Sequence, residues 1–210
     1  AQKFNLRRVL IVFQFSISLL FIIASLVVGR QINYMRDADM GFNSNAVVTV
    51  TDENAPPQKL RLFARQALAI PGVQEITLQG HAPVAGTITR DFTMQLDNRT
   101  DNTLSVYLQA ADRNFIPFYH IQLLAGRNLL SGDSLKEIII NDTYRKALGF
   151  SKPADAIGHS LTWQGRTLPI VGVVTDFHTS SLHSPIPSLA IARMVDRDNS
   201  IGLRITLSKH

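Results

Sequence analysis

The longest apolar stretch of the chain lies near its start, between Val9 and Gly29, where 21 consecutive residues carry no charged side chain. As a helix it would be ~31 Å long at a rise of ~1.5 Å per residue, close to the ~30 Å of a hydrocarbon core. Leu, Ile, Val and Phe fall on every face of that helix, whereas a helix in a soluble core is usually shorter and keeps a polar face. We therefore predict a transmembrane helix over 9–29.

Basic residues on the two sides of this stretch favour one orientation. Three precede it (Lys3, Arg7 and Arg8) and two follow it (Arg30 and Arg36), a weak positive-inside bias that places residues 1–8 in the cytoplasm and the main domain outside. A cleaved signal peptide is an alternative, but the apolar run exceeds a normal signal sequence and no A-x-A-like site follows it. A fully buried core helix is the other alternative, against which the length argues.

Residues 30–42 predict a helical stalk that Gly41 ends, and the rest of the chain alternates between strand-like and helix-like patterns. Residues 91–96 and 104–108 each alternate apolar with polar side chains, which predicts an antiparallel pair with one wet face. The expected strands are 46–51, 73–79, 91–96, 104–108, 136–141, 160–164, 167–174 and 201–207. The strands 160–164 and 167–174 are expected to form a pair joined by Gly165-Arg166, and a turn is expected over 123–127.

Three helices are predicted among these strands. The first opens at Pro56-Pro57, because proline is tolerated in a first helical turn. A second, short helix runs through 115–118 with Asp112 as its N-cap, and a third begins after Asn141 and ends at Gly149. One apolar face of the first helix is formed by Leu60, Phe63, Ala64, Ala67 and Leu68. Helices mixed with antiparallel strand pairs indicate an α+β domain.

The basic balance of the chain changes little in this picture. Of the net charge of +5, the first 40 residues hold +3 (five Lys/Arg against two Asp) and the other 170 hold +2 (16 against 14). The folded part therefore has too small a net charge to predict a strongly basic surface, and nucleic-acid binding has little support. The absence of cysteine excludes disulfides, thiolate metal sites and a cysteine nucleophile. The chain begins at Ala1 and ends at His210 after a strand-like run, as expected of a fragment of a longer membrane protein.

Six motifs, in this order along the chain, resemble the MacB/FtsX-like permeases of ABC transporters, and most closely those common in Bacteroidetes. The likeness covers most of the chain, and it is the combination of motifs that makes it specific. Besides the predicted span, the motifs are 31–42 (QINYMRDADMGF), 125–127 (AGR), 138–142 (IIIND) with 147–149 (ALG), 156–158 (AIG), and 170–178 (IVGVVTDFH) with 181–183 (SLH).

The resemblance implies a domain organisation and a role. Residues 43–210 would form a MacB-like periplasmic core domain, with a porter-like α+β subdomain made from both chain ends and a β-rich subdomain inserted at roughly 98–165. The protein would be a permease subunit in the bacterial inner membrane, working as a homo- or heterodimer with a separate ABC ATPase subunit. It would couple ATP hydrolysis to periplasmic work such as export, lipoprotein release or mechanotransmission, and a periplasmic or lipoprotein partner would take part.

Catalytic motifs are missing from the sequence. There is no G-x-x-x-x-G-K-[ST] phosphate loop and no G-x-S-x-G nucleophile elbow. The best polar cluster is Asp176, His178 and His183, whose spacing does not match a helical zinc-ligand pair. We expect Asp176 and His178 to hold a turn after a buried strand. We therefore predict no catalytic, metal or cofactor site and no enzymatic activity of the chain itself.

Other candidate residues also have structural interpretations. Arg127 is expected to hold a turn or a carboxylate, and Phe115, Phe118 and Tyr119 are expected in the core, although they could form a substrate-facing patch. In the membrane, the polar side chains could contact a neighbouring helix or simply face the bundle; they are Gln14, Ser16, Ser18 and Ser25. The alternative function is a membrane-anchored extracytoplasmic ligand-binding or sensor module, and a tethered hydrolase ranks last.

Overall fold

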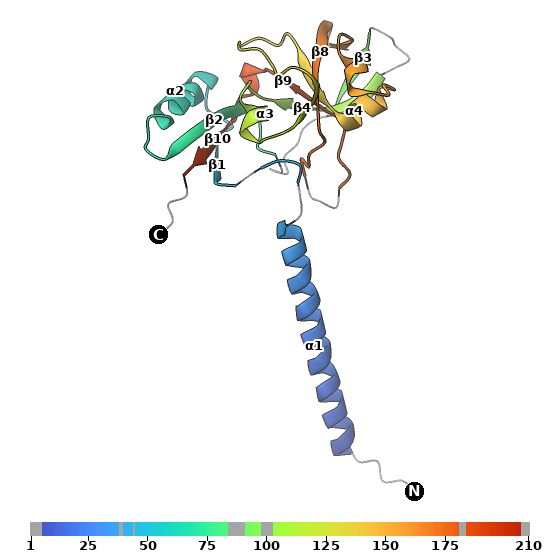
Figure 1. Cartoon of the computed structure of the whole chain (residues 1–210). Coiled ribbons are helices and arrows are strands. Elements are labelled where there is room, and N and C mark those ends of the chain that lie inside the picture. The colour runs from blue at the N-terminus through green and yellow to red at the C-terminus, as the bar shows by residue number, and fades with distance from the viewer. Residues whose placement is uncertain are drawn as a thin grey trace. The chain divides into compact units, whose positions relative to one another are not determined.

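The computed structural model describes residues 6–37, 40–43, 45–83, 91–97, 103–180 and 184–206. The chain divides into two compact units, residues 1–39 and 40–210. The first contains α1 (Leu6–Asp37), a continuous helix of 32 residues (Figure 1). Its stretch Arg7–Tyr34 is the one helix of the described residues that is long and apolar enough to cross a membrane.

The described side chains of α1 are all exposed, as expected of an apolar helix whose surface contacts lipid. The helix includes the predicted span 9–29 and continues through Asp37, so the first part of the stalk is helical as predicted. Whether Gln14 and the serines contact another helix stays a prediction.

The second unit is built on two sheets. The smaller has three antiparallel strands in the order β1-β10-β2, and the larger has seven in the order β5-β8-β6-β9-β4-β3-β7. The smaller sheet consists of β1 (Val47–Thr51), β2 (Val73–Gln79) and β10 (Ser200–Ile205). The larger consists of β3 (Asp91–Leu96), β4 (Thr103–Ala110), β5 (Leu123–Gly126), β6 (Ile138–Asn141), β7 (Ser160–Trp163), β8 (Arg166–Val174) and β9 (Leu189–Ala192).

Short helices connect these strands. They are α2 (Pro57–Ala67), α3 (Phe115–Phe118), α4 (Asp142–Ala147), η1 (Pro153–Ala156) and η2 (Val195–Arg197). The Asn141 side chain accepts the backbone N–H of Tyr144 at 3.0 Å, which confirms the predicted N-cap of α4. Gly149 ends that helix as predicted, with a φ of +88° that suits glycine.

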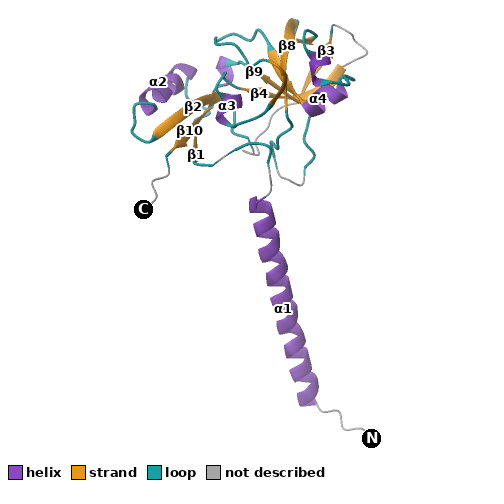
Figure 2. Ribbon diagram, in the orientation of Figure 1, coloured by secondary structure: helices purple, strands orange, loops and turns teal. Residues whose placement is uncertain are grey.

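The smaller sheet carries α2 on one face (Figure 2). Leu60, Ala64 and Ala67 are buried there, whereas the other two residues of the predicted apolar face, Phe63 and Leu68, are exposed. At ~100° per residue, these two side chains lie at the two borders of the stripe that Leu60 and Ala64 centre. The expected strands 46–51 and 73–79, which flank α2 in the sequence, lie in the same sheet, but β10 lies between them.

The larger sheet contains the two predicted hairpins. β3 pairs with β4 and β7 with β8, both antiparallel. The turn between β7 and β8 has positive φ at Gln164 and Gly165, +49° and +73°, as a two-residue hairpin turn of type I′ requires. Two parallel pairs, β4–β9 and β6–β8, make this sheet mixed.

The turn expected over 123–127 is wrong, because 123–126 form strand β5 against β8. Gly126 and Gly172 are register partners in that pair. A Cβ on Gly126 would lie 2.2 Å from the carbonyl oxygen of Val171, and one on Gly172 would lie 2.4 Å from that of Arg127. The two glycines therefore let the backbones of β5 and β8 approach, which no local pattern around 123–127 reveals.

Both ends of the second unit contribute to the smaller sheet, and the segment between them contributes the larger one. In Figure 1, β1 and β10 lie side by side although about 150 residues separate them. The larger sheet takes its strands from 91–192, a longer segment than the 98–165 expected for an inserted subdomain. The division into subdomains stays a prediction.

Candidate functional site

The polar cluster after β8 has a structural role. Asp176 accepts the backbone N–H of Thr143 at 2.8 Å and its hydroxyl at 2.9 Å, so it holds the start of α4. The backbone N–H of His178 donates to the carbonyl of Met40 at 2.9 Å. His183 lies outside the described residues, and among those described no three His, Asp or Glu side chains are grouped to hold a metal ion.

The predicted aromatic cluster is core. Phe115, Phe118 and Tyr119 are buried and belong to one core cluster with Phe177. The Phe115 ring contacts those of Tyr119 and Phe177, and the Phe118 ring contacts that of Tyr119. The expected structural role of these aromatic side chains is confirmed.

Arg127 closes a surface loop. Its guanidinium donates to both carboxylate oxygens of Glu137, at 3.0 and 2.6 Å. Glu137 Oε1 also accepts the backbone N–H of Leu130 at 2.6 Å. The hydrogen bond from Arg127 lowers the pKa of Glu137. Arg127 thus holds a carboxylate, as predicted, and fixes the two ends of the loop 128–136.

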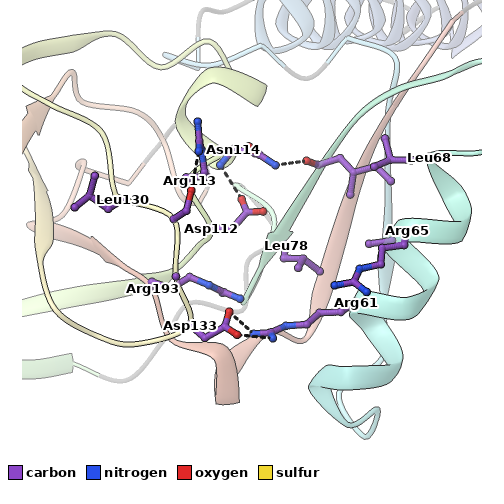
Figure 3. A pocket seen from close by; sticks show the side chains of 14 residues that line it. Arg61, Arg65, Leu68, Leu78, Asp112, Arg113, Asn114, Leu130, Asp133 and Arg193 are labelled. Atoms are coloured by element: carbon purple, nitrogen blue, oxygen red, sulfur yellow. Dashed lines mark hydrogen bonds and ion pairs between the residues drawn. The ribbon is translucent and has the colours of Figure 1, made fainter.

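This loop forms one wall of a cavity of 390 Å³, and α2 with β2 forms another (Figure 3). We call this cavity the cleft. That volume is within the range of small-molecule sites, about 300–1,000 Å³. The cleft is lined by Arg61, Ala64, Arg65, Leu68, Ile76, Leu78, Asp112, Arg113, Asn114, Leu130, Ser131, Gly132, Asp133 and Arg193.

Hydrogen bonds tie the walls of the cleft together. Arg61 on α2 forms a bidentate ion pair with Asp133 on the loop, both N–O distances being 2.8 Å. Arg113 donates to the hydroxyl of Ser131 at 2.7 Å, and the amide of Asn128 donates to the carbonyl of Arg113 at 2.7 Å. The walls of the cleft are therefore held together by contacts between segments distant in sequence.

Asp112 joins β2 to the turn before α3. Its Oδ1 accepts the hydroxyl of Thr77 at 2.7 Å and the backbone N–H of Asn114 at 3.0 Å. The expectation that Asp112 is the N-cap of α3 is wrong, since the N-cap is Asn114. Asp112 lies two residues before it and accepts the backbone N–H of that N-cap residue. Burial raises the pKa of Asp112, and the hydrogen bond from Thr77 offsets part of that rise.

A buried ion pair lies in the segment that connects β9 of the larger sheet to β10 of the smaller sheet. Arg193, just after β9, donates to both oxygens of Asp198 at 2.6 and 2.7 Å. The two residues are only 7% and 1% exposed. Arg193 also lines a second cavity of 520 Å³, whose other lining residues include Asp133 and Trp163.

The cleft has more cations than anions. It is lined by four guanidinium groups and two carboxylates. Arg61 and Arg193 are paired with Asp133 and Asp198. The side chain of Arg65, in contrast, forms no hydrogen bond or ion pair with any other described residue, and it is exposed on α2.

Sequence reasoning missed this cleft. Its one local signal is the spacing of Arg61 and Arg65. They are four residues apart, so they lie on the same side of a helix. The other charged residues of the site come from positions 112–133 and 193, and no spacing rule connects these segments. Only the pairing of the strands brings them together.

Comparisons with known proteins agree with this fold. The sequence model of the family described as MacB-like periplasmic core domain matches residues 9–204. The periplasmic region of MacB from Actinobacillus actinomycetemcomitans is 14% identical, with a TM-score of 0.57 over 81% of this chain and 78% of that one. No curated protein matches the chain in sequence.

Two further solved structures are similar in fold. A domain of a protein described as a permease, from Porphyromonas gingivalis, is 17% identical with a TM-score of 0.52, over 78% of this chain and 75% of that one. The extracellular domain of the noncanonic ABC-type transporter YknZ from Gram-positive bacteria is 10% identical with a TM-score of 0.50, over 76% and 75%. At these identities the likeness concerns the fold alone.

Proposed function

The chain belongs to the family of MacB-like periplasmic core domains, and from this membership we propose that it is the permease subunit of an ABC transporter. A partner subunit hydrolyses ATP in the cytoplasm, and the permease transmits the resulting motion to its domain outside the membrane. The work done there is export, lipoprotein release or another mechanical task. The chain itself carries out no chemical step.

The observation that carries this proposal is the extent of the family match. It covers residues 9–204 and so includes both the apolar helix and the mixed domain. The helix also continues without interruption from Leu6 to Asp37, about eight residues past the predicted span. A continuous helix is a rigid element, which supports a mechanical link between the membrane segment and the chain that follows it.

The proposed setting follows from the family and from the flanking charges. We place residues 1–8 in the cytoplasm, residues 9–29 in the inner membrane and the domain that follows residue 42 in the periplasm. The permease works as a homo- or heterodimer with an ABC ATPase, and a periplasmic or lipoprotein partner takes part. Because the chain has no cysteine, single cysteines can report this topology.

Reconstitution tests the permease role. The full-length protein and a nucleotide-binding subunit encoded beside it are placed in proteoliposomes, together and separately. We expect sustained ATP hydrolysis to depend on the presence of both. Hydrolysis that is identical with and without the permease, for every such subunit, would overturn the proposal.

The cleft favours a second candidate, an anchored extracytoplasmic binding or sensor module. A cavity of 390 Å³ lined by four arginines suits ligand recognition. The sequence of the full-length protein distinguishes the two candidates. Three further apolar spans after residue 210 support the permease, and a signalling domain there supports the sensor.

A further inference from the structure

We propose that the cleft binds an organic anion that has an apolar body and one carboxylate or phosphate head group. This inference goes beyond the transport role, because it assigns a ligand to the outer domain whatever the ATPase partner does. It rests on the charge of the cleft, on the apolar side chains exposed in it, and on the fixed geometry of its walls.

The head group would be recognised by Arg65, and Arg113 on the opposite wall adds to the positive charge of the cleft. The side chain of Arg65 has no partner among the described residues, and within the same residues the guanidinium of Arg113 donates only to the neutral hydroxyl of Ser131. Figure 3 shows Arg65 on the α2 wall and Arg113 on the opposite wall. A guanidinium offers five donors in a planar fork that matches the oxygens of a carboxylate or phosphate.

Three carboxylates near the cleft, those of Asp112, Asp133 and Asp198, stand against its four guanidinium groups, so the cleft keeps an excess of one positive charge. Asp133 is held by Arg61 through two hydrogen bonds, and Asp198 is held by Arg193 in the same way. The carboxyl of Asp112 is engaged by the Thr77 hydroxyl and a backbone N–H. A concave, partly apolar wall also focuses the field of the remaining cations on an incoming anion.

The apolar body would lie against two leucines. Leu130 on the loop is 62% exposed and Leu68 after α2 is 53% exposed, and both line the cleft. Leu130 has the largest exposed fraction among the large hydrophobic side chains described in 40–206. Ile76 and Leu78 on β2 extend this apolar surface. Covering such side chains is favourable, at about 25 cal/mol per Å² of apolar surface.

The loop that carries Leu130 is held in place before any ligand arrives. Glu137 accepts both Arg127 and the backbone N–H of Leu130, and Ser131 is bonded to Arg113. A site whose side chains are already positioned loses less entropy when it binds. Arg65 also lies in the last turn of α2, where a cation stabilises the helix dipole, so a lysine at this position separates the two roles.

The test measures binding of three small probes that share one apolar body to the full-length protein in zwitterionic nanodiscs without ATPase or nucleotide. The probes are 4-phenylbutyrate, its neutral amide and 4-phenylbutylamine, and 3-phenylpropyl phosphate tests the other head group. Ligand-observed NMR, corrected with empty nanodiscs, gives the affinities. We expect the two anions to bind about tenfold or more tightly than the amide, as charge-assisted hydrogen bonds predict, and the amine to bind least.

Variants then locate the site. Arg65→Gln with Arg113→Gln should remove the preference for anions, and Arg65→Lys should keep only part of it. Leu130→Ser should weaken the anions and the amide by the same factor. Lys59→Gln is the matched control, because it removes a cation from α2 that does not line the cleft, and it should change nothing. Thermal unfolding shows that each variant is folded.

Two results would overturn the proposal. One is equal affinity for butyrate and amide in the unaltered protein. The other is a preference for anions that survives in the folded double arginine variant, or that Lys59→Gln removes equally. Because no ATPase is present, either result leaves the permease role untouched, and failure of the permease role leaves the binding result untouched.

Discussion

Arg61 and Asp133 form a bidentate ion pair that joins the helix on the smaller sheet to a loop of the larger sheet. Both N–O distances are 2.8 Å, and the side chains are 27% and 68% exposed. A pair this exposed contributes little to stability, about 0–1 kcal/mol. The pair does fix the distance between the two walls of the cleft, although it adds little to the free energy of unfolding.

Asp133→Asn should therefore change the spread of wall separations more than the stability. Spin labels on cysteines replacing Lys59 and Ser134, in a chain that has no native cysteine, report the distance between the walls. We expect a broader distance distribution in the variant and a free energy of unfolding within about 1 kcal/mol of the parent. The charge swap Arg61→Asp with Asp133→Arg should narrow the distribution again. An unchanged distribution in Asp133→Asn would refute this role of the pair.

Arg193→Met should be strongly destabilising. The substitution leaves the carboxylate of Asp198, which is 1% exposed, without its partner, and breaking a buried pair in this way costs about 3–5 kcal/mol. Urea unfolding of the protein measures the loss. Arg193→Met with Asp198→Leu should recover much of the stability, since no buried charge remains. Asp196→Asn, on an exposed residue of the same segment, serves as the control.

The contribution of Glu137 should disappear in acid. Its pKa is lowered in the folded protein, chiefly by the hydrogen bond from Arg127, so its stabilising effect is present above the carboxyl's unfolded pKa. That effect is lost as the pH falls through the folded pKa. The stability difference between parent and Glu137→Gln, about 1 kcal/mol, should be constant near neutral pH and shrink in acid. A difference that grew on acidification, or matched that of exposed Glu53→Gln, would contradict this account.

Gly172→Ala should destabilise the β5–β8 pair. The added Cβ would lie 2.4 Å from the carbonyl oxygen of Arg127 and 3.2 Å from Leu123, and forcing a methyl group into such a site costs about 1–3 kcal/mol. Relative to the parent, hydrogen exchange in the variant should become faster for the amides of β5 and stay unchanged for those of β3, which would locate the effect. Exchange equal to that of the parent throughout the larger sheet would exclude the proposed close approach.

The elements that the sequence predicted well are those whose signals are local. Asn141 and Gly149 bracket α4 because capping is decided within a few residues, and the hairpin of β7 and β8 follows from the turn at Gly165. The apolar run at 9–29 needed only its length and composition. These features can be predicted without knowing which elements pack against one another.

The elements that were missed depend on distant partners. Residues 123–126 form a strand because Gly172, 46 residues away, gives the backbone room, and the local sequence resembles a turn. The cleft was missed for the same reason. Arg65 has the pattern of an ordinary solvated helix position, and only the fold places it across the cleft from Arg113 and Leu130.

The central claim is that this chain works with an ABC ATPase, and isolation of the native complex tests it most directly. The full-length protein is recovered by affinity isolation from its own membranes in mild detergent, followed by mass spectrometry and an ATPase assay. We predict recovery of a nucleotide-binding subunit and ATP hydrolysis by the isolated complex. Reproducible recovery of an otherwise intact complex with neither an ATPase subunit nor hydrolysis would contradict the permease role and favour the anchored binding module.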